Sequence, residues 1–317
     1  MVAVVIACQA HTPYLDACLA HLERQTYRDF EVVVVSDDAL ALDRPGVRTV
    51  RAGRVLPNRK RRLGAAASDA EIVAFIDDDA YPDPGWLAAA VRHFDDPAVV
   101  AAGGPAVTPP EDAPRLRASG AVYASPLVTA GTRHRYVAEP PRDVDALPSC
   151  NLLVRRAAFL RDADASARYW PGEDILTCHF AMRDGSRIAY DPAILVYHHR
   201  RAVFGPHLRQ VWSYGRFRGF FMRRFARSWR HAPYTVPAAF VLAHAALPTL
   251  LANRRSRPPT LLALGAYAAL VTWSAVREAR AARANPWLVA CGIYLTHLAY
   301  GAGFIAGALR EQIAYDP

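Results

Sequence analysis

Short blocks of apolar residues recur along the first half of the chain and predict its regular elements. Residues 2–7 and 30–35 are largely apolar runs, the pattern of strands that a parallel sheet buries on both faces. Between them, leucines recur at the spacing of an amphipathic helix: Leu15, Leu19 and Leu22. Thr12 is a candidate N-cap for this helix, and Pro13 fits its first position. A strand, a helix and a strand within about forty residues predict a βαβ unit with a right-handed crossover.

A third apolar run, residues 72–76, ends at an acidic triplet formed by Asp77, Asp78 and Asp79. Pro82 follows closely, so we expect the strand to stop at the triplet. Adjacent like charges repel one another, and a bound cation is one reason for a fold to keep them. Carboxylate oxygens suit Mg²⁺ or Mn²⁺ and leave room for a substrate phosphate. A solvated acidic turn is the alternative, but ligands of open α/β sheets bind beyond the carboxyl ends of strands, which favours the metal site.

The second predicted strand also ends on acidic residues, Asp37 and Asp38. Two acidic strand ends can converge at one edge of the sheet, where a carboxylate can accept hydrogen bonds from a base or a ribose. No GxGxxG follows the first strand and no GxxxxGK[ST] occurs in the chain. A dinucleotide cofactor and a P-loop are therefore unsupported.

A basic run precedes the third strand and consists of Arg54, Arg59, Lys60, Arg61 and Arg62. One interpretation is a solvated basic loop. The other is a cationic clamp on a diphosphate, because opposite charges attract strongly in a partly shielded cleft.

Residues 108–148 combine prolines, glycines and mixed polarity, which predicts a long irregular excursion. Such loops are commonly functional, and we expect this one to shape the pocket of a second substrate. The strand predicted over residues 149–156 carries the polar Asn151 in an apolar context. We assign Asn151 and Trp170 to the acceptor side of the site.

Glu173 and Asp174 follow a Pro-Gly turn and stand at the start of a predicted helix. Acidic residues in a first helical turn are favoured by the helix dipole, so capping is one explanation. The other is a general base, since a carboxylate placed here can take the proton from an attacking hydroxyl.

A further strand is predicted over residues 188–197 and is followed by His198 and His199. Single histidines are usually structural. Two in succession after a strand, in a chain with a carboxylate metal site, make a metal-ligand role an equal alternative.

Composition and charge divide the chain of 317 residues into two unlike parts. Hydrophobic residues make up 52% of it, which excludes disorder and is slightly rich for a soluble protein. Residues 201–317 hold 15 of the 38 lysines and arginines but only three of the 29 acidic residues. This asymmetry indicates a phosphate-rich partner, either nucleic acid or anionic lipid. Five scattered cysteines without metal-ligand spacing indicate reduced thiols in a cytosolic compartment, and no cleaved signal peptide is evident.

Residues 204–232 interleave aromatic residues with arginines, including Phe225, Arg227, Trp229 and Arg230. Such a stretch could stack on a nucleic-acid strand or lie as an interfacial helix on anionic headgroups. Three apolar segments without Lys, Arg, Asp or Glu then follow, over residues 234–251, 260–276 and 287–309. Each approaches the ~17–25 residues that span a bilayer, which favours the membrane. Two or three of them are expected to cross, because three spans would place the arginines of the first connecting loop outside.

In this order, five stretches resemble the family 2 inverting glycosyltransferases of the GT-A fold: residues 4–39, 60–87, 148–156, 171–185 and 196–201. The apolar tail resembles membrane-anchored, bacterial-type members. The resemblance implies an α/β fold with a Rossmann-like, mostly parallel sheet, followed by an α-helical membrane-associated region. We accordingly expect a glycosyltransferase domain over residues 1–203, a basic aromatic interfacial helix over 204–232 and a transmembrane region over 233–317.

The resemblance also implies residue roles. It implies that two groups of residues bind the nucleotide sugar, one at the end of the first strand and in its loop, the other around the sheet edge. Together they are Ala7, His11, Tyr14, Asp37, Asp38, Lys60, Arg61, Asp77 and Asp78. Asp79, with Asp77, takes the metal, and His198 or His199 completes its shell. Asp174 is implied as the base, with Glu173 beside it. The family's usual asparagine after the first strand is missing, and so is the QxxRW motif of processive synthases, so a single sugar addition is expected.

Together these features predict a metal-dependent inverting transfer from a nucleotide sugar to a lipid-linked or saccharide acceptor. Mg²⁺ or Mn²⁺, helped by Lys60 or Arg61, would neutralise the departing diphosphate. Membrane lipids are the other expected partners, with the catalytic domain facing the cytoplasm and no nucleic acid bound. A membrane-tethered nucleic-acid-binding protein and a catalytically inactive scaffold remain the alternatives, and the oligomeric state stays open.

Overall fold

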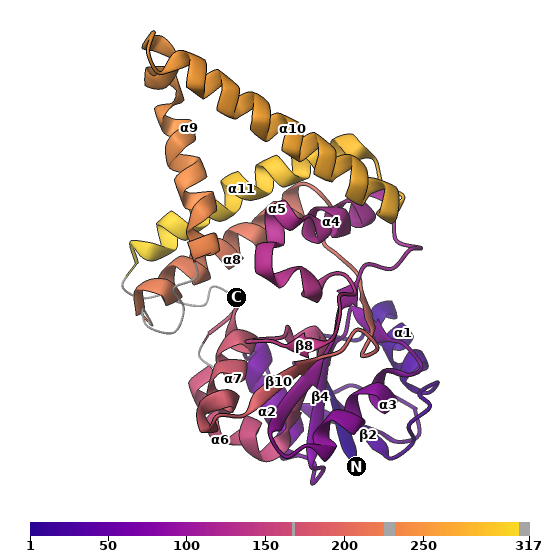
Figure 1. Cartoon of the computed structure of the whole chain (residues 1–317). Coiled ribbons are helices and arrows are strands. Elements are labelled where there is room, and N and C mark those ends of the chain that lie inside the picture. The colour runs from indigo at the N-terminus through magenta and orange to yellow at the C-terminus, as the bar shows by residue number, and fades with distance from the viewer. Residues whose placement is uncertain (167–168, 225–231, 311–317) are drawn as a thin grey trace. The chain divides into compact units, whose positions relative to one another are not determined.

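The computed structural model describes residues 1–166, 169–224 and 232–310 (Figure 1). The chain divides into two compact units. One, the sheet unit, comprises Met1–Val107 and His134–His199, and the other, the helical unit, comprises Thr108–Arg133 and Arg200–Pro317. The helical unit therefore takes in part of the excursion that the sequence places inside the first domain.

An eight-stranded sheet organises the first unit. Its strand order is β3 (Val47–Arg51), β2 (Phe30–Ser36), β1 (Val2–Ala7), β4 (Ile72–Asp77), β9 (Leu152–Arg155), β6 (Val99–Gly103), β10 (Arg187–Tyr190) and β8 (Arg142–Asp143). Strands β1 to β4 pair in parallel, as do β6 and β10. Strand β9 is antiparallel to both β4 and β6, and β8 is antiparallel to β10. The predicted mostly parallel sheet is confirmed.

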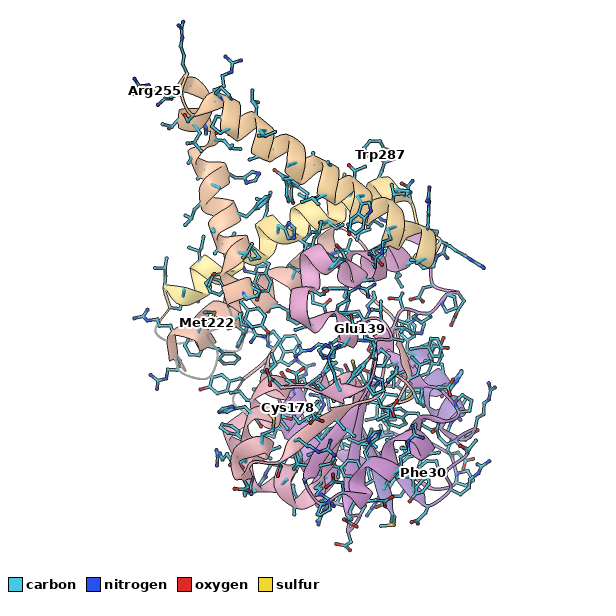
Figure 2. All side chains as sticks on the ribbon, in the orientation of Figure 1. Phe30, Glu139, Cys178, Met222, Arg255 and Trp287 are labelled. Atoms are coloured by element: carbon cyan, nitrogen blue, oxygen red, sulfur yellow. The ribbon has the colours of Figure 1, made fainter. Side chains whose placement is uncertain are left out.

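Helices cover both faces of this sheet because alternate strand residues point to opposite sides. Val2, Val4 and Ile6 of β1 join one core with α1 (Pro13–Leu22) and α3 (Trp86–Val91). Ala3 and Val5 join the other core, covered by α2 (Pro57–Ala66), α6 (Arg156–Ser166) and α7 (Glu173–Ala181). Figure 2 labels Phe30 of β2 and Cys178 of α7.

Helix α1 forms as its sequence predicts. Thr12 Oγ1 accepts a hydrogen bond from the Leu15 amide at 3.2 Å, Pro13 opens the helix, and the three leucines are buried. The basic run is different, because most of it lies inside α2 and not in a loop.

A second, three-stranded sheet joins segments far apart in the sequence. It consists of β5 (Ala80–Pro82), β11 (Val196–His198) and β7 (Ala106–Val107). Strand β11 is antiparallel to β5, with His198 opposite Ala80. The strand predicted over residues 188–197 is therefore divided between two sheets. Short 3₁₀ helices complete the sheet unit and its connections: η1 (Arg92–Asp95), η2 (Ala130–Arg135), η3 (Ser149–Asn151) and η4 (Met182–Asp184).

The helical unit contains α4 (Pro114–Ala124), α5 (Pro126–Thr129), α8 (Gly205–Arg224), η5 (Ala232–Thr235), α9 (Val236–Ala252), α10 (Arg257–Ala282) and α11 (Pro286–Ala308). The predicted irregular excursion thus holds two helices. Helix α8 forms most of the predicted basic aromatic helix, and residues 225–231, with Phe225, Arg227, Trp229 and Arg230, lie outside the described residues.

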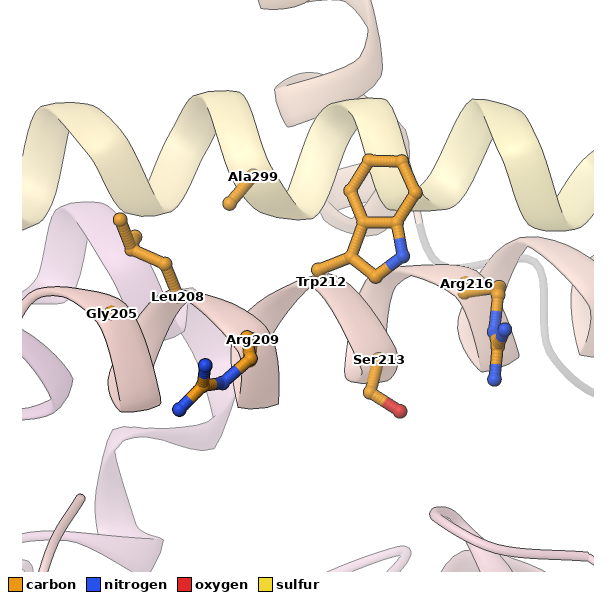
Figure 3. Close-up of a pocket in the computed structure, with 7 residues that line it drawn as sticks. All are labelled: Gly205, Leu208, Arg209, Trp212, Ser213, Arg216 and Ala299. Carbon is orange, nitrogen blue, oxygen red and sulfur yellow. The ribbon is translucent and has the colours of Figure 1, made fainter. Parts of the chain in front are cut away.

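Three helices of this unit are long and apolar enough to span a membrane: Pro233–Ala252, Arg257–Ala282 and Pro286–Ala308. Figure 2 shows Arg255 at the turn between α9 and α10. Figure 3 shows α8 running beside α11, with Leu208 and Trp212 near Ala299.

Candidate active site

The carboxyl ends of β1, β2 and β4 bring the predicted nucleotide-binding residues to one edge of the large sheet. Ala7 is the last residue of β1 and is paired with Asp77, the last residue of β4. Asp37 follows β2 directly, and its amide donates a hydrogen bond to Gln9 O at 3.3 Å. Because these strands are parallel, their acidic ends share one edge.

Lys60 ties two of these strand ends together. Its side chain is 4% exposed, its ammonium donates to Cys8 O at 2.6 Å, and it forms an ion pair with Asp37. A buried ammonium needs such partners. Asp38 lies apart, almost fully exposed and 3.9 Å from Arg51. Of the two acids predicted here, Asp37 is the one held at the sheet edge.

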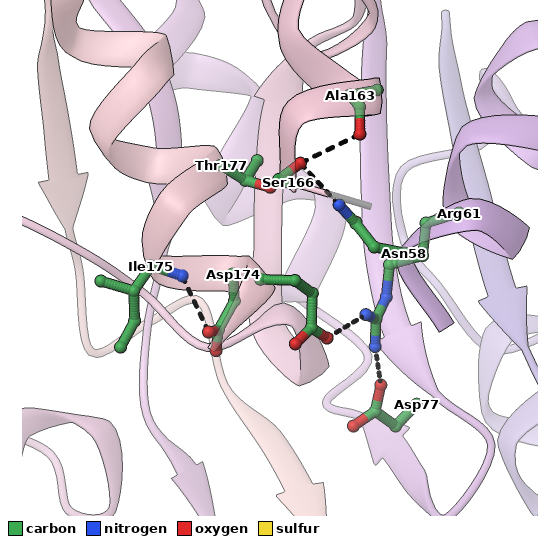
Figure 4. A network of polar contacts seen from close by, with 9 residues as sticks. Asn58, Arg61, Asp77, Ala163, Ser166, Asp174, Ile175 and Thr177 are labelled. Carbon is green, nitrogen blue, oxygen red and sulfur yellow. Dashed lines mark hydrogen bonds and ion pairs between the residues drawn. The ribbon is translucent and has the colours of Figure 1, made fainter. Parts of the chain in front are cut away.

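Arg61 joins the acidic triplet to the acidic pair of α7 (Figure 4). Its guanidinium donates to Asp77 Oδ1 at 2.8 Å and to Glu173 Oε1 at 2.9 Å, although 112 residues separate Arg61 from Glu173 in sequence. Both Arg61 and Glu173 are buried. Burial raises the pKa of Glu173 to about 7, against the lowering effect of Arg61 and with a further rise caused by Asp174. The two acidic motifs predicted separately therefore meet through one arginine.

Asp174 has a different environment from its neighbour. Gly172 precedes α7 as its N-cap with a φ of 107°, a left-handed conformation that glycine adopts without strain. Asp174 lies in the first helical turn and is half-buried, and its Oδ1 accepts a hydrogen bond from the Ile175 amide at 2.8 Å. No ion pair joins Asp174 to a cation among the described residues. Trp170, just before this turn, is 41% exposed.

The second sheet brings a histidine to the triplet. His198 Nε2 lies 3.0 Å from Asp79 Oδ1, and ligand atoms of Asp77, Asp79 and His198 all fall within 4.8 Å of one another. Burial opposes a charge on His198, but Asp79 outweighs it and raises the pKa of His198 to about 10. Two carboxylates and an imidazole are a donor set that fits a divalent cation. A cation bound by the imidazole would have to displace that proton.

His199 occupies a different position from His198. Its amide donates to Asp79 O at 3.0 Å, and its ring packs against the rings of Tyr14 and Tyr81, with centroids 4.6 and 5.8 Å away. His11 lies just before α1 and pairs with Asp16 at 3.0 Å. Asp78 stands between Asp77 and Asp79 in the connection from β4 to β5. The predicted loop residues and the second histidine thus collect near the sheet edge, whereas only His198 joins the carboxylate cluster.

Asn151, which the sequence assigns to the acceptor side, uses its side-chain amide in hydrogen bonds within the protein. It is fully buried, accepts a hydrogen bond from Trp86 Nε1 at 2.9 Å, and donates to Pro105 O and Ile194 O at 3.0 and 2.7 Å. These bonds join η3 to α3 and to the segments after β6 and before β11, and a contact between Asn151 and the acceptor stays a prediction. A polar residue inside an apolar run signals buried hydrogen bonding as readily as it signals a binding site.

Sequence reasoning missed the pairing of β5 with β11 and the bridging position of Arg61. The short run Ala80–Pro82 after the triplet is the only local signal for the pairing of β5 with β11. No local pattern indicates that Arg61 bridges two carboxylates.

The parallel sheet, its acidic carboxyl edge and the second small sheet define a GT-A type fold. A mannosyltransferase from Pyrobaculum calidifontis, solved with GDP-Man and Mn²⁺, has this fold, with a TM-score of 0.55 and 21% sequence identity over 98% of this chain and 88% of that one.

Residues 3–161 match the model of glycosyl transferase family 2, and the chain belongs to this family. It is 29% identical over 159 residues to the pre-mycofactocin glycosyltransferase of Mycobacterium tuberculosis, in two strains. That match covers 50% of this chain and 33% of the relative. The chain therefore matches about a third of the length of its curated relatives.

Proposed function

We propose that this protein transfers a sugar from a nucleoside diphosphate sugar to a hydroxyl or phosphate of an acceptor at the membrane, with inversion at the anomeric carbon. One observation carries the proposal. The cluster of Asp77, Asp79 and His198 is connected through Arg61 to Glu173 and Asp174. This arrangement supports a cation site and a carboxylate base at the same edge of the sheet.

Asp79, Asp77 and His198 would hold the divalent cation. When bound, the cation supplies positive charge that stabilises the departing nucleoside diphosphate. The imidazole favours a transition metal such as Mn²⁺ over Mg²⁺, and the mannosyltransferase of similar fold was solved with Mn²⁺. Lys60 and Arg61 are committed to protein carboxylates, so we propose that they position Asp37, Asp77 and Glu173 instead of contacting the diphosphate directly.

Asp174 is the proposed general base. Glu173 is engaged by Arg61 and buried, whereas Asp174 is half-buried and carries no ion pair with a described cation. A base must reach the acceptor hydroxyl, take its proton as the oxygen attacks, and hold that proton afterwards. Glu173 and Arg61 fix the first turn of α7 and with it the position of Asp174. Trp170, exposed beside this turn, remains the proposed acceptor contact.

Asp37, together with Ala7, His11 and Tyr14, forms the proposed nucleoside site. The carboxylate of Asp37 is held by Lys60 and can accept hydrogen bonds from a base or a ribose.

The acceptor is proposed to be lipid-linked or a saccharide, because the helical unit offers three helices of membrane-spanning length. We further propose that the catalytic unit faces the cytoplasm. All five cysteines are free thiols, as expected in a reducing compartment.

A binding assay and a transfer assay on the purified full chain in detergent test the proposal. UDP-, GDP- and dTDP-sugars are screened by thermal shift with and without Mn²⁺, because a ligand of the native state raises its apparent stability. We expect one donor class to stabilise the protein in a Mn²⁺-dependent manner and Asp79→Asn to remove that dependence.

The variant Asp174→Asn tests whether Asp174 acts as the general base or only stabilises the start of α7. We expect it to abolish transfer while donor affinity stays within a few-fold. Asp184→Asn, which changes an exposed aspartate paired with Arg161, is the matched control and should leave both properties intact. Equal loss of donor binding and transfer in Asp174→Asn would show that Asp174 only caps α7.

A further inference from the structure

The three long apolar helices differ in how far other helices cover them. In an apolar 18-residue stretch of each, 6% of residues are buried in Pro233–Ala252, the segment that contains α9, against 17% in α10 and 39% in α11. Six exposed large apolar side chains lie on α9 and α10, whereas α11 exposes Trp287 in its first turn; the six are Val236, Leu242, Leu261, Leu262, Leu270 and Trp273. Helix α11 is therefore an interior helix of its unit, whereas α9 and the first half of α10 expose apolar surface.

The N-terminal half of α11 packs against α4. Val289 and Ile293 of α11 share a core with Ala118, Ala121 and Val122 of α4. A Cβ at Gly292 would lie 2.5 Å from Val122, so the two helices touch closely. Helix α4 stands in sequence between β7 and β8 of the sheet unit, with no spanning segment before it. It must lie on the same side of the membrane as that unit, and so must the half of α11 that it covers.

The C-terminal half of α11 packs against α8. Glycines on both helices allow the backbones to meet, since a Cβ on any of them would collide with the partner's backbone: Gly215, Gly219, Gly303 and Gly307. His207 of α8 adds a buried polar link, with Nε2 2.9 Å from Thr296 Oγ1 of α11 and Nδ1 2.7 Å from Ser119 Oγ of α4. The two helices therefore occupy the same depth.

Helix α8 is rich in arginine and has no acidic residue. Figure 3 shows Arg209, Ser213 and Arg216 of α8 with their side chains pointing away from Ala299 of α11. With Trp212 they line an open pocket of about 490 Å³. No carboxylate among the described residues pairs with either arginine. If α11 crossed the bilayer, these arginines would enter hydrocarbon unpaired, which is strongly unfavourable. At the surface they would instead meet anionic headgroups.

We propose that the chain crosses the membrane twice, through α9 and α10, and that α11 does not cross but lies with α8 at the headgroups on the side of the sheet unit. Seventeen residues give α9 a length of about 25 Å, close to the ~30 Å of a hydrocarbon core. The turn after it carries Arg254 and Arg255, exposed cations that can extend to the far headgroups. This topology goes beyond the proposed sugar transfer and does not depend on it.

Cysteine labelling of the full chain in sealed inner-membrane vesicles of both orientations tests the topology. Native Cys291, the sole exposed cysteine, lies six residues into α11, and the other four are buried. In a Cys291→Ser background, Glu71→Cys marks the sheet unit, Arg255→Cys marks the turn and Leu309→Cys marks the end of α11. Each is treated with a membrane-impermeant maleimide and read by mass shift.

We expect Glu71→Cys, Leu309→Cys and native Cys291 to react from one face and Arg255→Cys only from the opposite face. Reaction of Leu309→Cys from the face of Arg255→Cys would mean that α11 crosses and would overturn the proposal. Reaction of Arg255→Cys from the face of Glu71→Cys, or from neither face, would show that the hairpin does not cross. Asn253→Cys repeats the turn measurement with every arginine retained, in case Arg255→Cys impairs insertion.

Discussion

Arg61 links Asp77 of β4 to Glu173 of α7, and its removal should destabilise the folded protein. Arg61→Met keeps the length and apolar stem of the side chain but removes the guanidinium. Glu173 then stays buried, with a side chain only 6% exposed, and loses its cation, while Asp77 loses the same partner. Breaking a buried ion pair by removing one partner typically costs about 3–5 kcal/mol.

That cost can be measured as a fall in melting temperature. For a domain of this size each kcal/mol lowers the Tm by roughly 2–4 °C, so the expected fall is roughly 6–20 °C. The measurement is thermal unfolding of the detergent-solubilised full chain, followed by circular dichroism. Adding Glu173→Gln to Arg61→Met should recover much of the loss, because the double variant no longer buries an unpaired carboxylate.

Arg161→Met is the matched control for this experiment. Arg161 also bridges two carboxylates, Asp162 and Asp184, at 3.0 and 2.8 Å, but it lies on the surface, so its loss should change the Tm little. A fall in Arg61→Met no larger than that of Arg161→Met, or no recovery in the double variant, would refute the interpretation of Arg61 as a buried electrostatic link.

Three further predictions concern other buried groups. Burial, helped by Arg200, lowers the pKa of His207 to about 4. Between pH 6.5 and 4 the unfolded chain therefore binds a proton that the folded chain does not, and acidification over this range should lower the free energy of unfolding by ~3 kcal/mol. The pH profile of the Tm should show this loss in the native chain and not in His207→Gln. Gly307→Ala should cost roughly 1–3 kcal/mol by forcing α8 from α11, whereas Gly265→Ala, with open space around it, should not lower the Tm. Asn151→Ala should destabilise by roughly 1–3 kcal/mol for each polar group left unsatisfied, while donor affinity of the folded protein persists in a titration.

The parts of the fold that local patterns specify were predictable. The cap at Thr12, the leucine spacing of α1 and the apolar runs of β1 and β4 each depend on residues a few positions apart, and the parallel sheet follows from their order. The acidic edge was predictable for the same reason, since it depends only on strands ending in aspartates.

The contacts that assemble the site were not predictable, because they join distant positions. The pair of Asp79 and His198 spans 119 residues and requires β5 and β11, strands of three residues each that carry no clear periodicity. The sequence leaves a phosphate clamp open for Lys60 and Arg61, because the charge of a side chain does not tell whether a protein carboxylate or a ligand will be its partner. The same holds for Asn151, whose three hydrogen-bond partners come from three separate segments.

The interruption of the sheet unit by α4 bears on how the protein can be shortened. A chain cut after residue 203, the predicted end of the glycosyltransferase domain, would retain α4 but lose α10 and α11, which cover Ala118, Ala121 and Val122. In the truncated product these apolar side chains of α4 would be exposed to water, and the product would tend to aggregate. A water-soluble version requires either polar replacements of these α4 side chains or a short loop in place of the segment Thr108–Arg133.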